Sequence, residues 1–214
     1  EGLASIFYNQ TFNYSYSKNI IMRNLALTKF ALKDFDFHSD IQNKIPFLFS
    51  SKKYSFGEIC KVKDNILLIP GASFQAKCYP IDKFIELINK IDANFLIIWG
   101  DEAEKKLAKQ IFNSSPKVNI MEKLSLDSLK SLISQVDLVI GSDTGPTHMA
   151  WALNVPSISL FGPTPGQRNT LITNINKIIE SETSVNPNKI NKSDYSIKNI
   201  KVSDVAEIAK DLLK

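Results

Sequence analysis

Short apolar runs alternate with longer amphipathic stretches over most of the chain. The apolar runs predict strands at residues 66–70, 94–100 (including a turn at its end), 118–120, 136–141 and 157–161. Between these runs, apolar residues recur at helical spacing, as expected for helices that bury one face. Strands that alternate with helices predict an α/β fold in which a parallel sheet is covered by helices on both faces.

Capping residues mark where the helices begin. Pro80 suits the first turn of a helix, and Asp101 with Glu104 has the spacing of a capping box. Hydroxyl side chains predict three further starts, at Ser17 for a helix before the sheet, at Ser125, and at Ser203 for the last helix.

The sheet is expected to place its first and fourth strands side by side, in the order 3-2-1-4-5. Ligands of such sheets bind beyond the carboxyl ends of the strands, where the strand order reverses. The turns after the strands at 66–70 and 136–141 should therefore face one another across a crevice. The glycine fingerprint of dinucleotide enzymes and the Walker lysine motif are both missing, which favours a sugar nucleotide as the ligand.

The turn after the fourth strand opens a helix and has an anion-binding chemistry. Asp143, Thr144 and Gly145 precede Pro146, and His148 follows within the first helical turn. Free backbone N–H groups and the helix dipole at such a terminus favour a phosphate. The alternative is that Asp143 or Thr144 only caps the helix and that His148 is a surface residue.

The run Ser-Asp-Thr-Gly-Pro-Thr-His-Met-Ala at residues 142–150, followed by Val-Pro-Ser-Ile-Ser-Leu-Phe-Gly-Pro-Thr at 155–164, resembles the nucleotide-sugar loop of the ADP-heptose-dependent glycosyltransferases (glycosyltransferase family 9). These enzymes build the inner core of lipopolysaccharide, and within the family the chain looks most similar to the heptosyltransferase I type. The resemblance implies that Asp143, Thr144, Gly145 and His148 bind the donor.

Four more donor contacts are carried over from the resemblance. Lys77 matches the lysine of the family's phosphate-side loop, and Ser73 matches one hydroxyl position, whereas Ala72 stands where relatives can carry a second hydroxyl. Glu104 matches the acid that contacts the nucleoside, and Leu124 the apolar residue beside the adenine. The alternatives are a solvated surface lysine, a helix-capping glutamate and a core leucine.

The resemblance also implies the domain organisation. Residues 1–60 are expected to be an arm and helix that lead from a preceding acceptor domain. Residues 61–214 are expected to be the nucleotide-sugar-binding domain, a Rossmann-like doubly wound sheet that forms the C-terminal, donor-binding half of a GT-B glycosyltransferase.

Composition narrows the range of function classes. The chain has 214 residues, 43% of them apolar, a net charge of +4 with dispersed basic residues, and two cysteines. This predicts a folded, cytoplasmic protein in a reducing compartment, without nucleic-acid binding, a metal site or a cofactor. No apolar run is long enough to cross a membrane, although transient contact with the inner face of the inner membrane is compatible with the resemblance.

The function expected from the resemblance is inverting transfer of heptose from ADP-heptose to a lipopolysaccharide inner-core sugar. The catalytic base is expected in the preceding domain, because the acidic or basic groups that the arm offers, Asp34, Asp36 and His38, have no sheet to fix them. Type I and type II heptosyltransferases, and the acceptor sugar, stay open. The alternatives are another GT-B nucleotide-sugar enzyme, such as an epimerase, and a non-catalytic nucleotide-binding module.

Overall fold

The computed structural model describes residues 6–33 and 43–214, and Asp34, Asp36 and His38 lie outside the described residues. Six parallel strands form one sheet in the order β3-β2-β1-β4-β5-β6. Their bounds are β1 Asn65–Ile69, β2 Asn94–Ile97, β3 Val118–Ile120, β4 Leu138–Ser142, β5 Ser157–Phe161 and β6 Asn176–Glu180. The expected order of the first five strands is confirmed, and β6 extends the sheet beyond β5.

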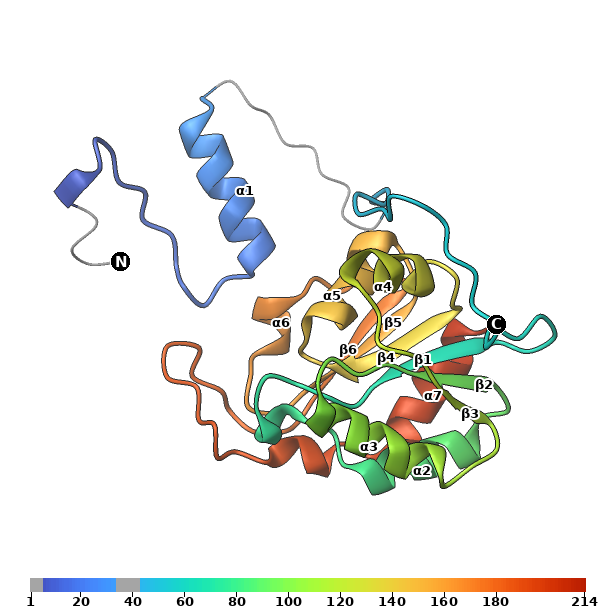
Figure 1. Cartoon of the computed structure of the whole chain (residues 1–214). Coiled ribbons are helices and arrows are strands. Elements are labelled where there is room, and N and C mark those ends of the chain that lie inside the picture. The colour runs from blue at the N-terminus through green and yellow to red at the C-terminus, as the bar shows by residue number, and fades with distance from the viewer. Residues whose placement is uncertain (1–5, 34–42) are drawn as a thin grey trace.

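Helices cover both faces of the sheet, as Figure 1 shows. Helices α2 (Ile81–Lys90), α3 (Glu102–Phe112) and α7 (Val202–Leu212) cover one face, and α4 (Leu126–Ile133) and α5 (Gly145–Leu153) cover the other. The remaining helices are α1 Ile20–Ala31 and α6 Gly166–Asn169, with short 3₁₀ turns at Gln75–Lys77 and Ser196–Asn199. The doubly wound α/β fold class is therefore confirmed.

Alternation along β1 divides the apolar residues between two cores. Ile66 and Leu68 point into the larger core, which α2, α3 and α7 complete, while Leu67 and Ile69 point into the core under α4 and α5. All five residues of β1 are buried, as expected for a central parallel strand. This leaves the carboxyl ends of β1 and β4 as the place where polar side chains can gather.

Two of the predicted helix starts differ from the structure. The side chain of Asn19, not that of Ser17, caps α1 by accepting a hydrogen bond from the Ile21 amide at 2.9 Å. Lys201, rather than Ser203, occupies the cap position of α7, without a side-chain cap. The caps at Asp101 and Ser125 are confirmed, since each side chain accepts from the amide three residues ahead.

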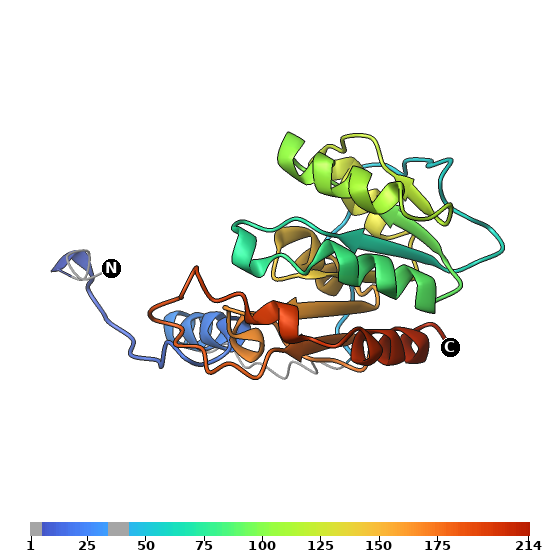
Figure 2. The ribbon, with the colours of Figure 1, turned by 90° about the horizontal axis from the view of Figure 1, so that it is seen from below.

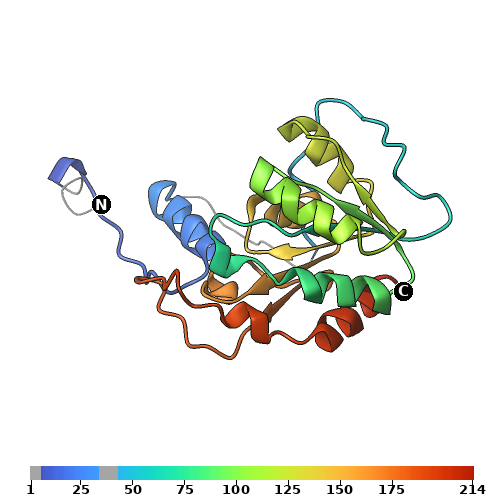
Figure 3. The same ribbon diagram turned by 60° about the horizontal axis from the view of Figure 1, so that its bottom comes forward.

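The segment before the sheet has two parts, of which only the second packs against the core of the sheet. Residues 43–60 lie along α4 and α5, where Leu48, Phe56 and Ile59 pack against the core. Helix α1 buries none of its residues, and Figures 2 and 3 show it standing away from the sheet, close to the loop that contains α6. The boundary at residue 60 between arm and domain stays a prediction.

Candidate nucleotide-sugar site

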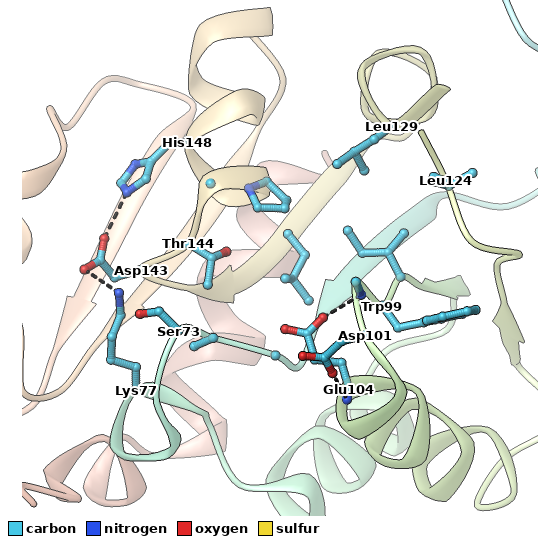
Figure 4. A pocket seen from close by; sticks show the side chains of 17 residues that line it. Ser73, Lys77, Trp99, Asp101, Glu104, Leu124, Leu129, Asp143, Thr144 and His148 are labelled. Atoms are coloured by element: carbon cyan, nitrogen blue, oxygen red, sulfur yellow. Dashed lines mark hydrogen bonds and ion pairs between the residues drawn. The ribbon is translucent and has the colours of Figure 1, made fainter. Parts of the chain in front are cut away.

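A crevice of about 590 Å³ opens at the carboxyl ends of the central strands. All eight residues predicted to bind the donor line it, namely Ser73, Lys77, Glu104, Leu124, Asp143, Thr144, Gly145 and His148. Figure 4 shows that seven of them, all but Gly145, come from the loops and first helical turns that follow several strands and converge from opposite walls. The fold therefore brings together residues that are separated by up to about 75 positions in the sequence.

Asp143 organises the cationic end of the crevice. One of its oxygens, Oδ2, lies 3.0 Å from Lys77 Nζ, and the other, Oδ1, lies 2.9 Å from His148 Nε2. Figure 4 shows the three side chains in a row along one wall. The side chains of Lys77 and Asp143 are only 10% and 9% exposed, so water screens this ion pair weakly.

The environment of Asp143 keeps its carboxylate charged. Burial alone would raise the pKa of Asp143, but the hydrogen bond from His148 and the charge of Lys77 outweigh it and hold that pKa well below its usual range. His148 meets Asp143 through Nε2, which leaves Nδ1 of the same ring for another partner.

The start of α5 supplies backbone donors beside this ion pair. Thr144 sits at the cap position, but its side chain makes no capping hydrogen bond; its hydroxyl instead lies 3.1 Å from that of Thr147. Helix geometry leaves the amides of Gly145 and Thr147 without intrahelical acceptors, and Pro146 has no N–H to satisfy. The alternative that Asp143 or Thr144 is an ordinary side-chain cap is therefore not supported, and the helix terminus can receive an anion.

Glu104 marks the opposite end of the crevice, on the first turn of α3. Its Oε2 accepts a hydrogen bond from the Gly100 amide at 2.6 Å, and its own amide donates to Asp101 Oδ1 at 2.9 Å. A Cβ atom on Gly71 would lie 2.1 Å from Glu104 Oε1, so glycine at this position leaves room for the carboxylate. Asp101 thus supplies the cap of α3, whereas the predicted capping box is only half formed, because the Glu104 carboxylate accepts from the Gly100 amide and not from that of Asp101. The second oxygen of Glu104 is directed toward the end of β1.

Apolar side chains form a wall next to Glu104. Leu124 and Leu129 line the crevice and also pack against the core under α4 and α5, so the two interpretations of Leu124 are compatible. Trp99 is fixed by a hydrogen bond of 2.9 Å from its Nε1 to the Met121 carbonyl oxygen. The crevice therefore has a cationic end at Lys77 and an apolar end beside the carboxylates of Asp101 and Glu104, as Figure 4 shows.

Sequence reasoning missed part of the site. Asn169, on the loop after β5, donates from Nδ2 to Asp143 Oδ2 at 3.1 Å. Arg168, which also follows β5, is not among the residues that line the crevice; its guanidinium donates to the Tyr16 carbonyl and to the Asn169 side chain. No spacing rule in the sequence indicates the contacts of Asn169 with Asp143 and of Arg168 with Tyr16, because they join the segment after β5 to the loop after β4 and to the arm before the sheet.

The family model of glycosyltransferase family 9 (heptosyltransferase) matches residues 1–197. The chain belongs to this family. Lipopolysaccharide heptosyltransferase 1 of Campylobacter coli is 38% identical over 231 residues, covering 99% of this chain and 66% of that protein. The enzyme of the same name from Escherichia coli K12 is 24% identical over 170 residues, covering 78% of this chain and 52% of that protein.

Solved structures of the same family share the fold of this chain. An Escherichia coli heptosyltransferase WaaC with ADP aligns with a TM-score of 0.74 at 17% identity, over 99% of this chain and 62% of that one. A family 9 glycosyltransferase from Veillonella parvula aligns with a TM-score of 0.75 at 15% identity, over 99% of this chain and 65% of that one. The family 9 chain described here thus spans about two thirds of these relatives or less.

Among residues 6–33 and 43–214, no helix combines the length and apolar character that crossing a membrane requires. Contact of this family 9 chain with a membrane surface stays a prediction.

Proposed function

We propose that this family 9 chain is the donor-binding portion of a lipopolysaccharide heptosyltransferase that takes ADP-heptose as its donor. The observation that carries the proposal is a crevice whose two ends differ chemically. Lys77 and the start of α5 form the cationic end, and Glu104 and Leu124 form an end that suits a nucleoside. A nucleoside diphosphate likewise has a negatively charged diphosphate at one end and an uncharged nucleoside at the other. Family membership favours a glycosyltransferase over an epimerase or a non-catalytic module.

The cationic end suits the charge that develops during sugar transfer. In an inverting displacement, an acceptor oxygen bonds to the anomeric carbon while the bond to the diphosphate breaks and its electron pair stays on the leaving oxygen. Lys77 and the amides of Gly145 and Thr147 would offset that growing charge, which lowers the transition-state energy relative to the bound donor. Protein groups alone, without a metal or cofactor, would offset the charge on the leaving diphosphate.

The other end of the crevice suits an adenosine. The Glu104 carboxylate can accept hydrogen bonds from ribose hydroxyls, as an acid after the second strand commonly does in such sheets. Leu124 and Leu129 offer an apolar surface to a purine ring. Ser73, which Figure 4 shows beside Lys77, would contribute one hydroxyl on the phosphate side, while Ala72 contributes none.

Base preference tests this assignment. ADP should bind more tightly than UDP, because a uracil would bury less of the wall formed by Leu124 and Leu129. Isothermal titration calorimetry of the 214-residue chain with ADP, UDP and NAD measures the preference. Equal affinities for ADP and UDP would remove the adenine assignment.

The catalytic base and the acceptor sugar are also part of the proposal, and similarity to the relatives supports them. We assign no catalytic base within the described residues, and we place it in the part of the longer relatives that this chain does not span. The acceptor would be an inner-core sugar of lipopolysaccharide. The division into an arm at residues 1–60 and a donor domain at 61–214, and a location in the cytoplasm with transient contact at the inner membrane, complete the proposal.

A further inference from the structure

The loop between β5 and β6 does not line the crevice, but its residue Asn169 donates a hydrogen bond to Asp143 at the charged end. Asp143 Oδ2 receives two donors, Lys77 Nζ at 3.0 Å and Asn169 Nδ2 at 3.1 Å. Asp143 is 8% exposed, so its carboxylate depends on protein donors to fix its position. Because Lys77 and His148 are both oriented by this carboxylate, a residue that fixes Asp143 also fixes them.

The direction of the Asn169 amide follows from its neighbour. Arg168 Nη1 donates to Asn169 Oδ1 at 2.9 Å, and a guanidinium has no acceptor. The amide oxygen of Asn169 must therefore face Arg168, which turns its NH₂ group toward Asp143. An amide in the opposite orientation would place an oxygen against the carboxylate.

Arg168 is itself held by the arm. Its Nε donates to the Tyr16 carbonyl at 2.8 Å, and its guanidinium carbon lies 4.1 Å from the centre of the Tyr16 ring. Asn19 donates from one side-chain nitrogen to the carbonyls of Gln167 at 2.7 Å and Thr170 at 2.8 Å, on either side of the pair Arg168 and Asn169. The contacts thus run from the arm to the crevice without a break.

We propose that Asn169 is a positioning residue for the donor-binding crevice, that it orients Lys77 and His148 through Asp143, and that Arg168 sets its amide by anchoring it to the arm at Tyr16. Arg168 then acts on the ligand only through Asn169. This role rests on the proposed binding of a nucleoside diphosphate, and the positioning itself exists in the ligand-free chain.

ADP titration of single and double variants tests the proposal. Asn169→Ala should weaken ADP binding about threefold to tenfold, the net worth of one hydrogen bond, while adenosine binding stays unchanged because Glu104 is at the other end of the crevice. Asn169→Asp, which has the same shape but presents an acceptor to Asp143, should weaken it more. Gln167→Ala, on the exposed neighbour in the same loop, is the matched control and should have no effect.

The double variant separates positioning from direct contact. If Arg168 acts through Asn169, then Arg168→Ala together with Asn169→Ala should bind ADP no more weakly than Asn169→Ala alone. If the two losses multiply, Arg168 contacts the ligand itself and the proposal is overturned. Equal losses for ADP and adenosine would also overturn it, since they would indicate a general structural role.

A ligand-free measurement keeps this test distinct from the proposed function. The chain has two histidines, so the ring signals of His148 can be assigned in NMR spectra with a His148→Gln variant. Asn169→Ala should shift those ring signals, and Gln167→Ala should not. Absent ADP binding by the unmodified chain would refute the proposed function, whereas unshifted His148 signals in Asn169→Ala would refute the positioning role.

Discussion

Replacing Lys77 with alanine should weaken ADP binding by about 1–3 kcal/mol while adenosine binding stays nearly unchanged. A charge-assisted hydrogen bond to a phosphate oxygen has this magnitude, and Lys77 is the one lysine or arginine among the described residues that line the crevice. Calorimetric titration of both ligands against the unmodified chain and Lys77→Ala measures the difference.

The adenosine titration is the control for this substitution. Lys77→Ala leaves Asp143 with two hydrogen-bond donors, His148 and Asn169, so the wall of the crevice should persist. Equal weakening of ADP and adenosine would show that Lys77 supports the structure of the site and does not contact phosphate.

Replacing Asp143 with alanine should lower the free energy of unfolding by about 3–5 kcal/mol at neutral pH. The substitution removes one partner of a nearly buried ion pair and leaves the Lys77 ammonium without its carboxylate. Urea unfolding of the unmodified chain, Asp143→Ala and the double variant Lys77→Ala/Asp143→Ala measures the loss. The double variant should be more stable than Asp143→Ala, because it removes the uncompensated charge as well.

The same ion pair predicts how the stability difference depends on pH. Because folding lowers the pKa of Asp143, its stabilisation is fully present above the unfolded-state pKa of about 3.9 and is lost as the pH falls toward the lower folded-state value. The difference between the unmodified chain and Asp143→Asn should therefore shrink below about pH 4. A difference that stays constant from pH 7 to the acid limit would contradict the assignment of a charged Asp143.

The parts of the fold that the sequence predicted depend on local patterns. Apolar runs such as the one in β1 and capping residues such as Asp101 and Ser125 act over a few positions, and the structure has them where the pattern indicates. Strand β6 was not predicted, since its sequence Asn-Lys-Ile-Ile-Glu has only two apolar residues and it lies at the edge of the sheet. Edge strands bury less of each residue and so leave a weaker pattern.

The parts of the site that the sequence could not predict depend on long-range contacts. Residues in the loops that follow strands, such as Lys77 after β1 and Asp143 after β4, could be paired because strand order alone places these loops together. Asn169 and Arg168 act through side-chain geometry that joins the loop after β5 to Asp143 and to Tyr16. Residue type and spacing gave no signal for these contacts, and the cap at Asn19 was missed because Ser17, two residues earlier, is an equally good capping type.

The measurement that tests the central claim most directly is the position of ADP on the chain. Intermolecular NOEs, recorded by NMR with methyl-labelled leucines, report which side chains lie next to the adenine. The account predicts NOEs from the adenine protons to the methyl groups of Leu124 and Leu129, which line the apolar end of the crevice. Adenine NOEs to other leucines, with none to Leu124 or Leu129, would contradict it.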